Sequence, residues 1–496
     1  MQKAYDNLKK YFKEIGLLQS ISTLAQWDND VTMPVGGSIL RQEQMMLLSG
    51  KIYQKLNNPK IAELIDKSEN ENLDDWQLAN IRKIKRQYLH NQALDKNLVE
   101  ATTKATLECE INWRSARKNN DFKLFSKYFA PLLKLIQETS QRKAELLKLS
   151  PYDALIDSYD EERKSAEIDI IFNDLENFLP NFVKQVQEKQ KSRKILPLSQ
   201  NFTEDRQLDL NLACIKALGF NLNNGRLDTS AHPFSCGLSP DDVRITTRYD
   251  QKNFLSSLFG TLHETGHGIY EQNLPNSNVL SFQPVAHACG MVIHESQSLF
   301  VERHIGETKE FFSWLKPSLI KAFGNHPEIA SNNLYNIITR LSSSLIRIEA
   351  DEVTYPAHII LRYKLEKAML SGDLPIEELP AAWDEQLYKL LQIKPKNHSE
   401  GCLQDIHWAF GGFGYFPTYT LGAMFAAQID NYLRKSIDVS NLIKSGNFLP
   451  IISWLNENIH SLGSKYSSDE LIVRSTGSAL DVNIFKNYLK DKYLAS

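Results

Sequence analysis

The sequence lacks the features that mark several common classes of protein. None of its apolar runs approaches the roughly 18 residues of a membrane-spanning helix, and its first residues lack the apolar core of a secretory signal. The charge is nearly balanced, with 57 basic against 60 acidic residues, so the basic excess typical of nucleic-acid-binding proteins is absent. We therefore expect a cytoplasmic protein that binds neither membrane nor nucleic acid.

Cysteine is also scarce, with five residues among 496 and no two spaced as Cys-x-x-Cys. An odd number of scattered cysteines predicts neither a disulfide framework nor a zinc site built from cysteine. We expect reduced thiols at Cys109, Cys214, Cys236, Cys289 and Cys402. Internal repeats and long linkers rich in Pro, Gly or Ser are absent as well, so we expect one domain although the length allows two or three.

Apolar residues recur at spacings of three and four through most of the chain, which predicts a mainly helical protein. The predicted helices are 1–26, 38–56, 59–68, 74–118, 122–148, 165–193 and 205–218, with helical texture across nearly everything after 251. The segment 242–249 differs, because Val243 and Ile245 alternate with Arg244 and Thr246 as in a strand. We expect a small sheet embedded in a large helical body.

The strongest chemical signal is His263-Glu264-Thr265-Gly266-His267. On a helix, residues four apart lie on one face about one turn apart, so His263 and His267 can bind the same metal ion. Glu264 is displaced by about 100° around the helix axis, which suits it to accept a proton from water as a general base. The alternative is a pair of ordinary histidines on a surface or core helix.

A catalytic zinc site needs a third protein ligand and one open position. Glu271 lies one turn beyond His267 and can approach the site only awkwardly, whereas Glu295 lies on a second predicted helix that can return antiparallel to the first. Glu302 shares the face of Glu295, but a solvated helix charge is the favoured interpretation. We predict that His263, His267 and Glu295 bind one Zn²⁺ per chain, with Co²⁺ as a substitute in vitro.

Several further segments share their order with one known family. They are His232-Pro233-Phe234, Asp242-Val243-Arg244-Ile245-Thr246, His294-Glu295-Ser296-Gln297, Arg347-Ile348-Glu349-Ala350-Asp351, Gly401-Cys402-Leu403-Gln404-Asp405-Ile406-His407-Trp408 and Gly414-Tyr415-Phe416-Pro417-Thr418-Tyr419. With these motifs the chain resembles the carboxypeptidase Taq family of thermostable metallocarboxypeptidases over nearly its whole length. The resemblance implies a helical single-domain fold with a deep central groove, a homodimer, and peptide substrates with a free C-terminus. We expect one peptidase domain over 1–496, with a helical cap at roughly 1–150 and a catalytic core at roughly 205–430.

A carboxypeptidase must bind a free carboxylate, and arginine suits this because its planar guanidinium donates two parallel hydrogen bonds. Arg347, expected on a helix that lines the groove, is the first candidate, and Arg244 is the second. The alternative for each is a structural ion pair, with Glu349 or Asp351 for Arg347 and with Asp242 for Arg244.

Other side chains of these motifs are candidates for contact with the substrate. Tyr415 or Tyr419, after a predicted helix that carries His407, can donate a phenol to the oxyanion, and His407 can hydrogen-bond to the substrate; packed core residues are the alternative. Asp405 can orient a metal-bound histidine or cap a helix. His232 is expected to shape the wall of the groove, and the edge of the predicted strand can pair with an extended peptide.

The predicted function is therefore a zinc-dependent metallocarboxypeptidase that releases single C-terminal amino acids with broad specificity. One alternative is an oligopeptidase or dipeptidyl peptidase on the same metal centre, because groove closure and not the motif decides where a peptide is cut. The second is a helical scaffold whose His-Glu-x-x-His pattern is accidental or decayed. The intact Glu264 and the available third ligand argue against decay.

Overall fold

The computed structural model describes residues 3–277 and 280–495, and it confirms a mainly helical fold with one small sheet. Its packing divides the chain into two compact units, each built from segments that are distant in sequence. The first unit comprises the chain up to Asn91, Lys194–Ile338 and Phe425–Leu480. The second comprises Gln92–Arg193, Thr339–Met424 and the chain from Asp481 onward.

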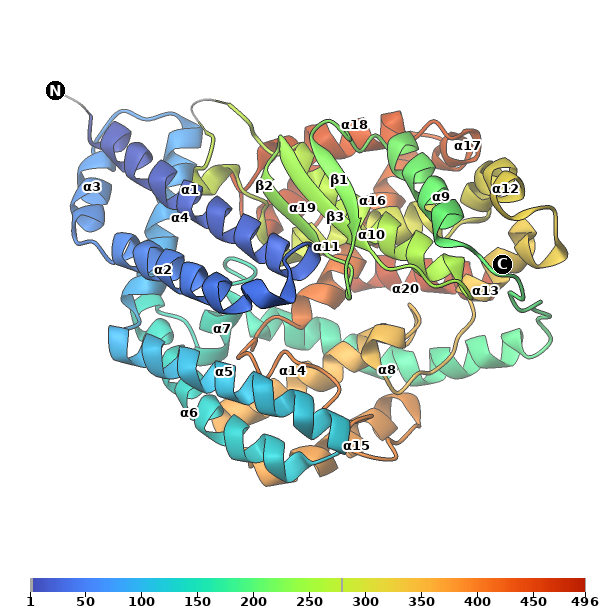
Figure 1. Ribbon diagram of the computed structural model, residues 1–496, viewed down its shortest axis with the longest axis horizontal. Helices are drawn as coiled ribbons and strands as arrows, with labels where there is room; N and C mark the ends of the chain where they lie inside the picture. Colours follow the sequence, from blue (N-terminus) through green and yellow to red (C-terminus); the bar gives the residue numbers. More distant parts are fainter. Residues whose placement is uncertain (1–2, 278–279, 496) are drawn as a thin grey trace. The chain divides into compact units, whose positions relative to one another are not determined.

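The first unit contains the sheet and the helices that pack on it (Figure 1). Its elements are α1 (Ala4–Val31), α2 (Ser38–Leu56), α3 (Lys60–Ser68), α4 (Asp75–Gln92), α9 (Glu204–Ala217), β1 (Gly225–Thr229), β2 (Ser235–Ser239), β3 (Asp242–Thr247), α10 (Phe254–Gln272), α11 (Gly290–Leu299), α12 (Lys309–Phe323), α13 (Ser331–Ile338), α17 (Val439–Ser445), α18 (Leu449–Asn458) and α19 (Ser468–Thr476). The helix α16 (Pro417–Ser436) begins in the second unit and ends in the first.

The second unit is helical throughout its regular elements. These are α5 (Lys96–Asn119), α6 (Phe122–Leu147), α7 (Pro151–Ile156), α8 (Ser165–Gln190), α14 (Tyr355–Ser371), α15 (Leu379–Leu391) and α20 (Val482–Lys490). Most predicted helices are present, but the predicted helix 74–118 is two helices, α4 and α5. Asp95 separates them, because its carboxylate accepts the backbone N–H of Leu98 and so caps the start of α5.

The sheet lies beside α10 in the order β1-β3-β2 (Figure 1). Val243 and Ile245 of β3 are fully buried, as the alternating pattern predicts. The Oγ of Thr247, at the end of β3, accepts a hydrogen bond of 3.0 Å from Thr261 on α10. β3 is paired with β1 on one side and β2 on the other. The expectation that β3 pairs with a substrate peptide is therefore wrong, because this strand has no free edge.

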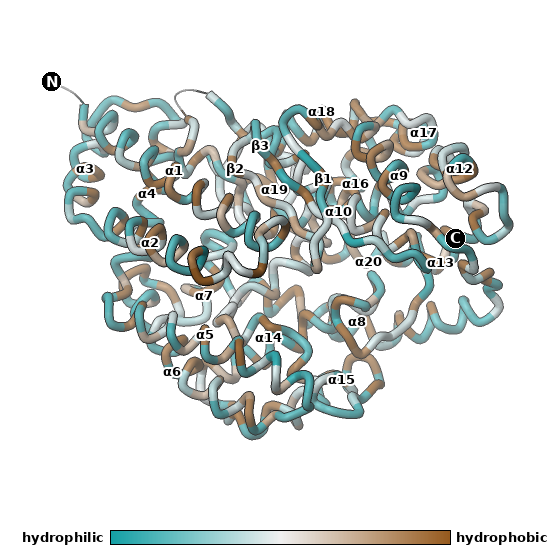
Figure 2. Tube along the Cα trace, viewed as in Figure 1, coloured by the Kyte–Doolittle hydropathy of each residue, from teal (hydrophilic) through white to brown (hydrophobic). Residues whose placement is uncertain are grey.

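Amphipathic helices supply the core, as the spacing of apolar residues predicts. In α1, apolar and polar residues alternate along the helix (Figure 2), and Leu8, Phe12 and Ile15 are buried. All five cysteines are free thiols and four of them are buried. Among the described residues, no helix is long and apolar enough to cross a bilayer.

The segment that carries Arg347 departs from the predicted helix. A single 3-10 turn begins at Arg347, and α14 starts only later. The carboxylate of Asp351 accepts backbone N–H groups from Ser342, Val353 and Thr354. Side-chain acceptors of this kind compete with the helical hydrogen bonds of the backbone. This part of the chain therefore forms a loop that is held by hydrogen bonds to Asp351.

Candidate active site

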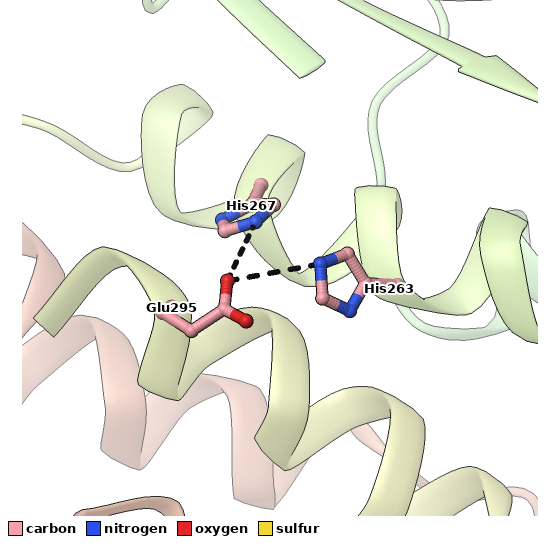
Figure 3. Close-up of side chains that lie close together, drawn as sticks. All are labelled: His263, His267 and Glu295. Atoms are coloured by element: carbon pink, nitrogen blue, oxygen red, sulfur yellow. Dashed lines mark ion pairs between the residues drawn. The ribbon is translucent and has the colours of Figure 1, made fainter. Parts of the chain in front are cut away.

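His263, His267 and Glu295 converge on one point in the first unit (Figure 3). The two histidines lie on α10 and the glutamate on α11, and one ligand atom of each lies within 4.8 Å of the others. Oε2 of Glu295 is 3.7 Å from Nε2 of His263 and 3.4 Å from Nε2 of His267. Donors bound at about 2.1 Å to a tetrahedral metal lie roughly 3.4 Å apart. The three side chains therefore fit a single ion the size of zinc.

Glu302 holds the ring of His263 from behind. It lies in the π-helix Phe300–Gly306, which continues α11, and its Oε2 accepts a 2.7 Å hydrogen bond from Nδ1 of His263. In the neutral ring this bond keeps the proton on Nδ1, so Nε2, which faces Glu295, is available to bind a metal. The interpretation of Glu302 as a solvated helix charge is wrong, because its side chain is 19% exposed and engaged with His263.

A second histidine–glutamate pair lies beside His267. Oε1 of Glu271 is 2.8 Å from Nε2 of His294, and the rings of His294 and His267 have centroids 4.4 Å apart. Gly237 leaves room for Glu271, because a Cβ there would lie 2.5 Å from its Oε2. Glu271 thus supports His294 rather than the metal site, in line with its awkward placement on α10.

The electrostatics of this site favour a bound cation. Burial opposes protonation of His263, but Glu295 and Glu302 outweigh it and raise the pKa of His263 to about 10. Burial lowers the pKa of His267 to about 4 and raises that of Glu264 to about 7. The protein therefore gathers negative charge around His263 inside its interior, where a divalent cation is the natural counter-charge.

The position of α11 against α10 depends on Gly266, between the two histidines. A Cβ at Gly266 would lie 2.4 Å from the carbonyl oxygen of Gln297 and 2.6 Å from Cα of Ser298. Both of these atoms belong to the backbone of α11 close to Glu295. The glycine of the His-Glu-Thr-Gly-His segment thus sets how closely the third ligand approaches the first two.

We expect Gly266→Ala to destabilise the protein by about 1–3 kcal/mol, because the added methyl group must push the backbone of α11 away. Gly50→Ala in α2 is the matched control, since a Cβ there meets nothing within 4 Å and alanine favours a helix by about 1 kcal/mol over glycine. Urea unfolding of both variants and the wild type measures the difference. Equal stability of Gly266→Ala and the wild type would contradict the close approach.

In the second unit, the predicted substrate-binding residues Arg347, His407, Tyr415 and Tyr419 form one cluster. The Arg347 guanidinium lies 5.2 Å from the ring centroid of Tyr419. The His407 ring is 5.7 Å from that of Tyr415 and 6.4 Å from that of Tyr419. The predicted helix around His407 is absent, because residues 401–411 form turns and bends without a helix.

Arg347 is 6% exposed and donates to partners that the sequence did not predict. Its Nε and Nη2 donate to Oδ1 of Asp405 at 3.1 and 2.9 Å, and its Nη1 donates to the hydroxyl of Tyr355 at 2.7 Å. The ion-pair partner of Arg347 is therefore Asp405 and not Glu349 or Asp351. Neither role predicted for Asp405, a helix cap or a partner of a metal-bound histidine, is correct.

Asp405 also binds Arg362, a residue that the sequence analysis missed. The Arg362 side chain is completely buried on α14, and its Nε donates to Oδ2 of Asp405 at 2.6 Å. The sequence signal that could have revealed Arg362 is its position directly after the apolar run Ile359-Ile360-Leu361, whose side chains are all fully buried. A charge in such a run needs a buried partner.

The two remaining candidates, Arg244 and His232, lie in the first unit. Arg244 donates from Nε and Nη2 to Asp242 at 2.9 Å each, which is the structural pair considered as its alternative. Its guanidinium also lies 4.4 Å from the centroid of the Trp27 ring. His232 is exposed, and its carbonyl oxygen accepts a hydrogen bond from Ser230.

Stability should fall in acid because of His358, which is fully buried. Burial, followed by the nearby charge of Arg362, lowers the pKa of His358 to about 3. This folded-state pKa lies below the unfolded value of about 6.5, so the contribution to stability is present above pH 6.5 and is lost as the pH falls toward 3. From pH 6.5 to 4.5 the protonation of this one group in the unfolded chain should remove about 2 kcal/mol of stability.

The variant His358→Gln tests this, because an amide N–H can still donate to the carbonyl oxygen of Ser344, which lies 3.1 Å from Nε2 of His358. Urea unfolding at pH 7 and pH 4.5 should show a smaller loss of stability in acid for the variant than for the wild type. The same loss in both proteins would mean that His358 does not stay neutral in the folded state.

Two imidazoles and one carboxylate that can share an ion, with the further carboxylate of Glu264 on the helix of the two histidines, are typical of a metallopeptidase centre. Residues 7–493 match the model of the carboxypeptidase Taq (M32) metallopeptidase family. Thermostable carboxypeptidase 1 of Thermus thermophilus is 34% identical over 512 residues, covering 100% of this chain and 99% of that relative. Carboxypeptidase 1 of Bacillus subtilis is 34% identical over 98% of this chain and 97% of its own length.

A solved structure agrees with these sequences. Trypanosoma cruzi metallocarboxypeptidase 1 has a TM-score of 0.97 with 37% sequence identity, and the match covers 99% of both chains. The chain therefore belongs to the carboxypeptidase Taq family of metallopeptidases. This confirms the family and the mainly helical fold that the sequence motifs predicted.

Proposed function

We propose that the protein is a zinc-dependent carboxypeptidase that releases single amino acids from the C-terminus of peptides with broad specificity. The convergence of His263, His267 and Glu295 beside Glu264 carries this proposal, in a chain that belongs to a family of metallocarboxypeptidases. Two imidazoles and one carboxylate suit zinc, one ion per chain, and also allow cobalt to replace it.

Zinc held by His263, His267 and Glu295 would supply Lewis-acid chemistry at the scissile carbonyl. Glu264, next to His263 on α10 and 6% exposed, accepts the proton of the attacking water and passes it to the leaving amine. Glu302 keeps the His263 ring in the tautomer that presents Nε2 to the site.

We assign recognition of the substrate carboxylate to Arg347, ahead of Arg244. Of the five N–H donors of the Arg347 guanidinium, three have acceptors among the described residues, on Asp405 and Tyr355. The other two suit the parallel hydrogen bonds of a carboxylate. Arg244, in contrast, already makes a two-bond pair with Asp242.

The aromatic and histidine residues around Arg347 complete the proposed subsite. Burial lowers the pKa of His407 to about 4, so it is neutral at pH 7 and can hydrogen-bond to the substrate without adding charge. Tyr415 or Tyr419 would donate to the oxyanion, and His232 would shape the groove wall. We also propose a cytoplasmic homodimer with one peptidase domain over 1–496, a cap at roughly 1–150 and a catalytic core at roughly 205–430.

Product analysis tests this function. Purified protein would be incubated with N-blocked dipeptides and one longer peptide, with and without a metal chelator, and the products identified by mass spectrometry. Stepwise loss of single C-terminal residues that the chelator stops is the expected result. Internal fragments or released dipeptides would instead support the oligopeptidase or dipeptidyl peptidase alternative, and no cleavage after zinc addition would contradict the proposed site.

A further inference from the structure

The Asp405 carboxylate lies between two buried guanidinium groups. Its Oδ1 accepts from Nε and Nη2 of Arg347, and its Oδ2 accepts from Nε of Arg362. The side chain of Gln404 links the same two arginines, because its Oε1 accepts from Nη2 of Arg362 and from the backbone N–H of Arg347, both at 2.8 Å. Gln404 and Asp405 therefore each accept hydrogen bonds from both arginines.

Arg362 differs from Arg347 in its burial, because its side chain is completely enclosed whereas that of Arg347 is 7% exposed. Its Nη1 donates to the carbonyl oxygen of His358 at 2.7 Å, so each of its three nitrogens has an acceptor, and its side chain is 0% exposed. Burial opposes ionisation of Asp405, but Arg362 first and Arg347 second outweigh it and hold the pKa of that carboxyl well below its usual range. Two positive charges thus meet one negative charge.

The other titratable groups near this cluster add little charge at neutral pH. His358 and His407 are neutral, since burial lowers their pKa values to about 3 and about 4. Glu366 lies one turn beyond Arg362 on α14, and burial raises its pKa to about 7, so it is only partly ionised. Its acceptor oxygens are also turned to other donors, namely Tyr152, Trp408 and the Gly414 amide.

We propose that Arg362 is a positioning residue that neutralises Asp405 and so leaves the charge of Arg347 available to the substrate carboxylate. This inference rests on the proposed function, which assigns Arg347 to that carboxylate. Without Arg362, Asp405 and Arg347 would form a closed one-to-one ion pair, and such a neutral pair attracts a second carboxylate far more weakly than a cation does. Arg362 therefore sets the preference for a free C-terminus without touching the peptide.

The test measures the preference for a free carboxylate over its amide. An N-blocked dipeptide and the same dipeptide with a C-terminal amide would be titrated calorimetrically into zinc-loaded Glu264→Gln protein, which is expected not to consume them. We expect Arg362→Met to reduce the ratio of the two affinities by roughly tenfold or more. Arg362→Lys, which keeps the charge, should preserve most of the ratio.

The double variant Arg362→Met with Asp405→Asn separates charge from structure. It removes one positive and one negative charge, so it restores the surplus charge of Arg347 although it disturbs the packing further. We expect it to recover most of the preference that Arg362→Met loses, whereas a merely structural role for Arg362 predicts a further loss. If Arg362→Met does not fold, as judged by circular dichroism, this double variant decides alone.

Failure of this inference is distinguishable from failure of the proposed function. Arg347→Met should abolish the preference for the acid. If it does so while Arg362→Met leaves the preference intact, or if the double variant does not recover it, the role of Arg362 is overturned and that of Arg347 stands. If Arg347→Met leaves the preference intact, the assignment of Arg347 to the carboxylate is itself wrong.

Discussion

Replacing Glu264 with Gln is expected to lower kcat by about 1,000-fold, or about 4 kcal/mol in the activation barrier, with zinc still bound. The amide keeps the size and position of the side chain but cannot accept a proton from water. Glu264 does not contribute to the converging ligand atoms of His263, His267 and Glu295, so the metal content should stay at one ion per chain. Hydrolysis of an N-blocked dipeptide and elemental analysis of the same sample measure both quantities.

The control for this variant is Glu43→Gln on the exposed surface of α2, which should retain full activity. Loss of zinc together with activity in Glu264→Gln would show that Glu264 supports the metal instead of acting as the base. Activity within tenfold of the wild type would mean that another group accepts the proton.

The metal centre was largely predictable because most of its information is local. His263 and His267 lie four residues apart on one helix, so their joint reach follows from helix geometry alone. The prediction of Glu295 depended on a second helix that returns to the first. It came from a sequence motif and not from helical periodicity. The role of Glu302 could not be predicted from the sequence. Its hydrogen bond with Nδ1 of His263 depends on the π-helix that follows α11, and no residue pattern predicts that π-helix.

The cluster around Arg347 was predicted only in part, for a related reason. Arg347 and His407 were found through motifs, but the partners of Arg347 depend on which segments pack together. Asp405 lies 58 residues from Arg347 in sequence and 43 from Arg362, and no periodicity relates positions so far apart. The prediction of a helix at Arg347 was wrong because the Asp351 carboxylate accepts backbone N–H groups there. The spacing of apolar residues does not reveal such a side-chain acceptor.

The metal ligands themselves give the second large effect. Glu295→Gln should weaken zinc binding by more than 100-fold, because it removes the one anionic ligand of the site. Glu302→Gln should weaken binding by about 10–100-fold, the usual effect of losing a residue that orients a ligand. In that variant the His263 ring keeps a hydrogen-bond acceptor but loses the negative charge behind it. Zinc titration against a competing chelator measures both affinities without relying on activity.

Glu271→Gln is the matched control, because Glu271 also binds a histidine, but His294 is not among the converging ligands. The zinc affinity of Glu271→Gln should stay within about threefold of the wild type. A carboxylate that orients a histidine affects metal affinity only when that histidine binds the metal. Thermal unfolding adds an independent readout, because zinc that binds only the folded protein raises its stability by RT ln(1 + [Zn]/Kd). The stabilisation by added zinc should therefore decrease in the order wild type, Glu302→Gln, Glu295→Gln. If Glu302→Gln bound zinc as tightly as Glu271→Gln does, the hydrogen bond from His263 would be incidental, and α10 alone would fix the ring.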